Sequence, residues 1–150
     1  MRVALAMGVM TVVGAIALAA TATSIAPPTV PCAGIIGQAK SGHNGGHRIV
    51  LDVVSVPPRY LRDVVRVSSR PWIYWRKEGL VIRANRRDVI VRVPKRWQKR
   101  AAITWGNATG IVSALRVAAC PSPRDVWNAY AGGFYLRSRS ACVPLTFRVG

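Results

Sequence analysis

The stretch that decides the fold is CPSPRDVWNAYAGGFYLRSRSAC, from Cys120 to Cys142, in which turn residues, aromatic residues and arginines lie between two thiols. Thiols of a chain that leaves the cytoplasm are oxidised. The stretch is therefore expected to form a loop closed by a Cys120–Cys142 disulfide on a β-scaffold. Closing that loop contributes about 3 kcal/mol on the loop-entropy model.

The chain has three cysteines, so at least one of them has no partner within it. Cys120 and Cys142 are the preferred pair because both lie at the borders of strand-like segments. Cys32 lies in a segment rich in proline and glycine, and it is either the leftover thiol or pins that segment to the body. The sequence alone leaves this connectivity open.

Short β-branched runs separated by turn residues follow one another at the intervals of an all-β domain. Residues 80–83 and 89–93 are expected to form a hairpin across the polar turn 84–88. Residues 94–100 begin with proline and lack alternation, which favours a single helical turn that crosses between sheets. The other strand-like runs are 48–56, 72–75, 102–105, 111–119 and 143–149, while 60–67 fits a strand or a short helical turn equally well.

These runs predict an all-β domain over residues 48–150, an antiparallel immunoglobulin-like β-sandwich of about six to eight short strands. A small open barrel is the alternative. The chain has 150 residues, of which 51% are hydrophobic, and this is enough for one packed core.

The N-terminal segment predicts export. Residues 3–20 contain no charge and no proline, and Ala20-Thr21-Ala22 places small residues where a signal peptidase cuts. Residues 1–22 are thus expected to be a hydrophobic signal helix, and the protein to be secreted or extracytoplasmic. The alternative is an N-terminal membrane anchor, because about 20 apolar residues span a bilayer. Residues 23–47 are rich in proline and glycine and are interpreted as a linker.

The formal net charge is +17 and the sequence pI is about 11.6, which favours anionic partners. A bias toward arginine also follows from GC-rich coding, so the charge alone does not identify the anion. The expected partner is an anionic cell-wall polymer or another envelope protein. Nucleic acid is not expected, and contact with a membrane is expected only through the N-terminal segment.

No catalytic or cofactor motif is present, so the chain is expected not to be an enzyme and to need no cofactor. His43 and His47 are separated by two glycines and have no third ligand nearby, so no metal site is predicted. One alternative is an envelope glycan hydrolase that uses a carboxylate such as Asp125 or Glu78 as acid or base. Another is a cationic membrane-active protein, which is disfavoured because the basic residues are scattered through the strands.

Two clusters combine aromatic and basic residues, which stack on sugars or bases and attract anionic polymers. Half or more of these aromatic residues are expected in the core. The second cluster is the preferred ligand site, because prolines and glycines place it on a loop. The first cluster is Trp72, Tyr74, Trp75, Arg76 and Lys77. The second comprises Trp127, Tyr130, Phe134, Tyr135, Arg137 and Arg139, of which all but Phe134 are the predicted ligand residues.

The strings WNAYAGGFYLRSRSACVPLTFRVG, AAITWGN and YWRKEGLVIRA resemble those of uncharacterised small secreted proteins of GC-rich bacteria. The resemblance spans most of residues 48–150. No activity, ligand or catalytic residue is attached to that group, so the resemblance supports export alone.

Overall fold

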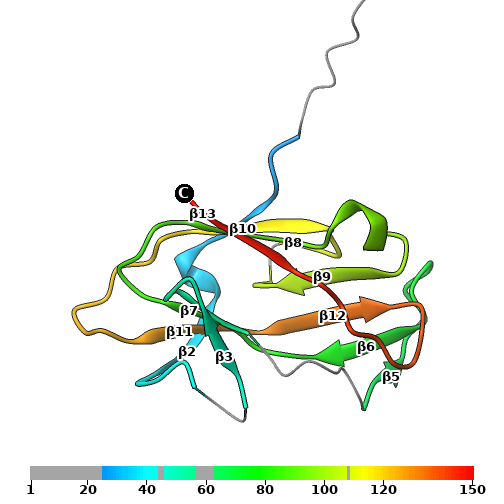
Figure 1. Cartoon of the computed structure of the whole chain (residues 1–150), viewed down its shortest axis with the longest axis horizontal. Coiled ribbons are helices and arrows are strands. Elements are labelled where there is room, and N and C mark those ends of the chain that lie inside the picture. The colour runs from blue at the N-terminus through cyan, green and yellow to red at the C-terminus, as the bar shows by residue number, and fades with distance from the viewer. Residues whose placement is uncertain (1–24, 44–45, 57–62, 108) are drawn as a thin grey trace, which may run out of the picture.

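The computed structural model describes residues 25–43, 46–56, 63–107 and 109–150. The predicted signal segment, 1–22, lies outside the described residues. The described part is all-β, with thirteen strands in three sheets, two short 3-10 helices and no α-helix (Figure 1). None of its helices has the length and apolar character that a membrane crossing requires. The prediction of an antiparallel, sandwich-like all-β fold is confirmed, with more strands than the six to eight expected.

The three sheets take their strands from distant parts of the chain, and every pairing is antiparallel except that of β1 with β10. Sheet 1 has the order β1 (Thr29–Val30), β10 (Ala114–Val117), β8 (Val89–Arg92) and β13 (Thr146–Val149). Sheet 2 has the order β2 (Ile35–Ala39), β11 (Trp127–Tyr130), β7 (Leu80–Arg83), β4 (Val54–Val56) and β3 (Arg48–Val50). Sheet 3 has the order β5 (Val65–Arg66), β6 (Tyr74–Lys77), β12 (Gly132–Leu136) and β9 (Ala101–Trp105).

Sheets 2 and 3 share one long, bent ribbon, formed by β6 and β7 against β11 and β12. The register does not shift along it, from Tyr74 opposite Leu136 to Arg83 opposite Trp127. Where the ribbon passes between the sheets, the Glu78 amide donates to the Gly132 carbonyl at 2.9 Å. Sheets 2 and 3 therefore form one layer below sheet 1 in Figure 1.

Two glycines of β12 allow the strands on its two sides, β9 and β6, to approach it closely. A Cβ on Gly132 would overlap the carbonyl oxygen of Thr104, and one on Gly133 would overlap that of Arg76. Glycine usually weakens a strand, but it is required where another backbone comes this near. The pair Gly132-Gly133 thus belongs to a strand here, and not to a turn.

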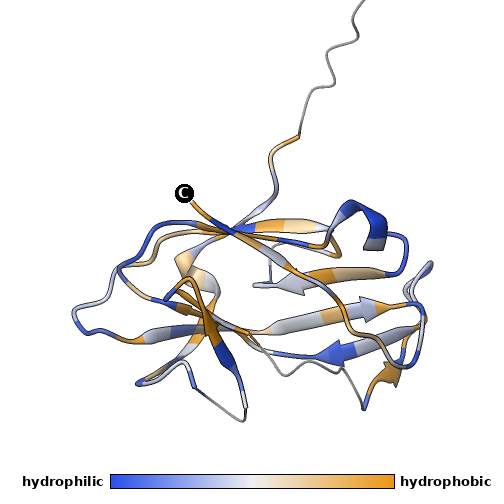
Figure 2. Ribbon diagram, in the orientation of Figure 1, coloured by the Kyte–Doolittle hydropathy of each residue, from blue (hydrophilic) through white to orange (hydrophobic). Residues whose placement is uncertain are grey.

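The core lies between the two layers and follows the alternation of the strands. In β8, Val89 and Val91 are fully buried while Arg92 is exposed. From the other layer, the Phe134 ring meets the Trp105 ring edge-on, with 5.4 Å between the centroids. Figure 2 shows the complementary pattern, with hydrophilic residues along the short helix η2 (Lys95–Trp97) and on exposed turns.

The predicted hairpin of residues 80–83 and 89–93 is wrong. Strand β7 lies in sheet 2 between β11 and β4, so both of its edges are already paired, and β8 crosses to sheet 1. Asn85 holds the crossover, because its side chain exchanges two 2.7 Å hydrogen bonds with the backbone of Ser122. The predicted helical turn at 94–100 is confirmed as η2, which leads from sheet 1 to sheet 3.

The segment 23–47, interpreted as a linker, needs correction because its described part contributes to the sheets. Strand β1 pairs with β10, and β2 pairs with β11 along the edge of sheet 2. Strand β1 precedes a short helix, η1 (Cys32–Gly34), and β2 follows it. The body therefore begins well before residue 48.

Candidate functional site

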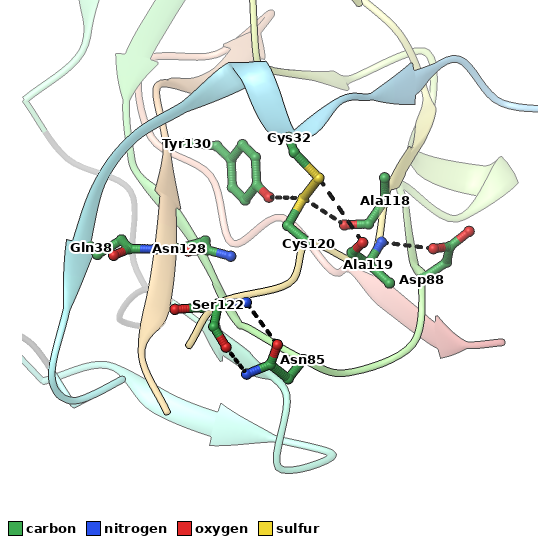
Figure 3. The surroundings of a disulfide bond; sticks show 10 residues. All are labelled: Cys32, Gln38, Asn85, Asp88, Ala118, Ala119, Cys120, Ser122, Asn128 and Tyr130. Carbon is green, nitrogen blue, oxygen red and sulfur yellow. Dashed lines mark hydrogen bonds between the residues drawn. A yellow bond between two sulfur atoms is a disulfide. The ribbon is translucent and has the colours of Figure 1, made fainter. Parts of the chain in front are cut away.

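A disulfide joins Cys32 to Cys120, with 5.5 Å between the two Cα atoms (Figure 3). Cys142 is free and exposed. The preferred Cys120–Cys142 pairing is therefore wrong. The physical reason is the topology: β2 runs along β11, and this pairing brings the helix η1 against the segment that precedes β11. The bridge spans 88 residues of sequence, far more than the loop expected between Cys120 and Cys142.

Two of the predicted ligand residues, Tyr130 and Trp127, lie inside the protein. Tyr130 is 1% exposed, and its hydroxyl lies 3.4 Å from the Cys120 sulfur. Burial raises the pKa of Tyr130 to about 12. Trp127 is 6% exposed, and a Cβ on Gly42 would come within 2.9 Å of its indole ring. Neither ring face is open to a ligand.

The five predicted site residues do not converge on one surface. Tyr135 lies in β12 of sheet 3 and is partly exposed, and Arg137 and Arg139 follow it on an exposed turn. Trp127 and Tyr130 lie in β11 of sheet 2 and are buried. The expectation of one aromatic and basic loop fails because residues 127–136 are two consecutive strands whose side chains alternate between faces.

Asp125 is held in an ion-pair network centred on Arg83. The guanidinium donates to both Asp125 oxygens, at 2.9 and 2.6 Å, and to Asp52 at 2.7 Å. The hydrogen bond from Arg83 lowers the pKa of Asp125, and the same contacts raise the pKa of Arg83. A general acid needs a raised pKa. The lowered pKa therefore favours a structural role for Asp125, in which Arg83 links it to Asp52.

Glu78 belongs to a second polar chain that sequence reasoning missed. His47 lies between Ser55, whose hydroxyl is 3.0 Å from Nδ1, and Glu78, whose carboxylate is 3.6 Å from Nε2. Although these residue types recur in hydrolases, Ser55 is 1% exposed and its hydroxyl donates to the Gly42 carbonyl. The hydroxyl is thus turned inward, away from any substrate. No three His, Cys, Asp or Glu side chains are grouped as metal ligands in the described residues.

Several arginines gather on the outward side of sheet 1. The register places Arg116, Ile90 and Arg148 in one row across β10, β8 and β13. Neighbouring strands are about 4.8 Å apart, so the two arginines of this row are separated by roughly 10 Å. Two residues along β8, Arg92 also lies on the outward side. The arginine face is defined by Arg86, Arg87, Arg92, Arg116 and Arg148.

The charges of the arginine face are only partly compensated. Asp88 pairs with Arg116 at 2.8 Å, and Arg86 lies 3.5 Å from Asp52. Within the described residues, Arg87, Arg92 and Arg148 make no ion pair with a carboxylate. Exposed guanidinium groups of this kind bind carboxylates and phosphates through paired hydrogen bonds.

A shallow hollow of about 660 Å³ lies on this face. The sequence shows Arg92 on the polar face of a strand and the pair Arg86-Arg87 in a turn. Arg116 and Arg148 join these arginines on one surface only through the register of β10 and β13 with β8. That register joins residues far apart in the chain, so the sequence pattern does not show it. The hollow is lined by Arg86, Arg87, Asp88, Ile90, Arg116, Ala119, Arg148 and Gly150.

Comparisons with protein-family models, with curated proteins and with solved structures gave no match.

Proposed function

We propose that the protein is a non-enzymatic, extracytoplasmic binding domain that holds an anionic polymer of the cell envelope on its arginine face. The observation that carries this proposal is the row of Arg116, Ile90 and Arg148, extended at the hollow by Arg86 and Arg87. A sheet face with cations spaced roughly 10 Å apart suits a repeating anion better than a small compact one.

The compartment is supported by two observations. The apolar run 3–20 has the pattern of an export signal. The Cys32–Cys120 disulfide is of the kind that persists in oxidising compartments. Immunoglobulin-like connectivity and a signal helix remain predictions that accompany this proposal.

A non-enzymatic role is supported by the arrangement of the two candidate carboxylates. Asp125 is bound by Arg83, and Glu78 faces His47 and Arg76. A glycosidase needs two carboxyl groups facing one another across a substrate, at about 5 to 9.5 Å. The structure instead gives each of these carboxylates a cationic or imidazole partner.

The test is binding of the full-length chain to poly-L-glutamate, a flexible polyanion without rings, measured by titration calorimetry over a salt series. The double variant Arg87→Gln/Arg148→Gln should bind about tenfold more weakly, because each exposed ion pair contributes up to about 1 kcal/mol. Affinity of the unaltered chain should fall as salt rises, because added ions screen the charges.

The matched control is Arg96→Gln/Arg124→Gln, which removes the same charge from two exposed arginines that do not line the hollow. This control should bind poly-L-glutamate nearly as well as the unaltered chain. An equal loss in both double variants would show that net charge alone attracts the polymer, and the arginine face would then not be the site.

A further inference from the structure

The outward side of sheet 3 carries a second surface, which unites one residue from each of the two aromatic clusters. The register places Val65, Trp75 and Tyr135 in a row across β5, β6 and β12. Their chain neighbours point inward, since Phe134 and Leu136 are buried in the core. Directly opposite residues of an antiparallel pair lie close enough for their side chains to interact, so Trp75 and Tyr135 form a single aromatic strip.

The strip is accessible in the described part of the chain. Trp75 and Tyr135 are half-buried, with the Trp75 indole Nε1 buried and without a hydrogen-bond partner among the described residues, while Val65 is 54% exposed and Ile73 is 40% exposed. Figure 2 shows the hydrophobic colour of β5, which pairs with the first half of β6. The exposed parts of these side chains offer aromatic and apolar area to a partner without unfolding any strand.

One cation lies beyond each side of the strip. Lys77 lies two residues after Trp75 on β6. Arg137 lies two residues after Tyr135, just beyond the end of β12, and because the two strands are antiparallel it is on the opposite side of the strip. At about 3.3 Å per residue, the two cations are roughly 13 Å apart along the strand direction, with the aromatic pair between them. Both are exposed, and neither makes an ion pair with a described carboxylate. The aromatic face is defined by Val65, Ile73, Trp75, Lys77, Tyr135 and Arg137.

We propose that the aromatic face binds an acidic polysaccharide, whose sugar rings lie on Trp75 and Tyr135 and whose acid groups pair with Lys77 and Arg137. Charge complementarity selects this occupant, because a neutral glycan would leave both cations unused and a ringless polyanion would leave the aromatic strip unused. Two adjacent rings with one cation beyond each side suit two sugar rings whose acid groups point outward.

This site is separate from the arginine face. Sheets 1 and 3 belong to opposite layers, with the core between them, so their outward sides look away from one another (Figure 1). The inference therefore goes beyond the proposed function, and either one can fail while the other stands.

The test compares two polyanions on the full-length chain: polygalacturonate, which has one carboxylate on each sugar ring, and poly-L-glutamate, which has carboxylates and no rings. The variant Trp75→Val/Tyr135→Val should bind polygalacturonate at least about tenfold more weakly, because each aromatic stacking contact contributes about a tenfold gain or more. Its affinity for poly-L-glutamate should stay unchanged.

The matched control is Trp75→Phe/Tyr135→Phe, which keeps both rings and should retain affinity for polygalacturonate. Valine suits a strand, and thermal unfolding of each variant confirms that it is folded. An equal loss for both polymers, or no loss for either, would overturn the inference. If Arg87→Gln/Arg148→Gln alone abolishes polygalacturonate binding, the aromatic face is not a site while the arginine face is.

Two further outcomes would replace the glycan with another occupant. Tighter binding of single-stranded poly(dT) than of polygalacturonate, lost in the valine variant, would identify a nucleic-acid face. Concentration-dependent dimerisation in analytical ultracentrifugation, lost in the same variant, would identify a contact between copies of this chain. Either result would overturn the proposal.

Discussion

Replacing Cys32 with alanine removes the bridge to Cys120 and should destabilise the fold strongly. The disulfide joins residues 88 apart, and the loop-entropy relation gives about 4.6 kcal/mol for a loop of that length. A domain of this size is stable by only about 5–15 kcal/mol, so the substitution removes about a third or more of the free energy of unfolding. With a urea dependence of about 1.5 kcal/mol per molar, the unfolding midpoint should fall by about 3 M.

The assay is urea unfolding of Cys32→Ala and of the control Cys142→Ser, together with a count of reactive thiols. Cys142 is exposed and free, so the control should unfold at the same urea concentration as the unaltered chain and should lose its accessible thiol. A loss of about 3 kcal/mol in Cys142→Ser, with a reactive thiol appearing on Cys120, would show that the bridge runs to Cys142 and would refute the reasoning.

Two more predictions concern the shared ribbon and the Arg83 network. Gly133→Ala should cost about 3 kcal/mol in urea unfolding, because its Cβ would overlap the Arg76 carbonyl oxygen. Gly79→Ala, with no atom within 4 Å of the new Cβ, should cost little, and equal costs would contradict the close approach. The pKa of Asp125 is lowered from 3.8, so its contribution to stability is present above that pH and is lost as the pH falls through the lower, folded-state pKa. Asp125→Asn should therefore be less stable than the unaltered chain at neutral pH and approach it in acid, and a constant difference across this range would count against the ion pair.

The features of the fold that depend on nearby residues were predictable from the sequence. Residues 89–93 were expected to form a strand, and Val89–Arg92 form β8, in which Val89 and Val91 are buried. The proline at position 94 identified the helical turn that crosses between sheets. Both signals are local, because a strand's period and a helix's first turn are set by a few consecutive residues.

The features that depend on distant residues were not predictable. Gly132 and Gly133 suggested a turn, since nothing nearby in sequence reveals that the Thr104 and Arg76 carbonyls approach them. The partner of Cys120 was wrong for the same reason, because the pairing of β2 with β11 is what brings Cys32 to it. Of the predicted ligand residues, only Tyr135 and Arg137 lie on a surface for which a site is now proposed.

The pairing of β1 with β10 and of β2 with β11 also constrains the order of assembly. A chain is made from its N-terminus, so residues 29–39 emerge long before residues 114–130, which supply their partners. Until then β1 and β2 have no partner strands, and Cys32 cannot form its disulfide with Cys120. Maturation is thus expected to wait for nearly the whole polypeptide, and chains truncated before residue 114 should be substrates for proteases.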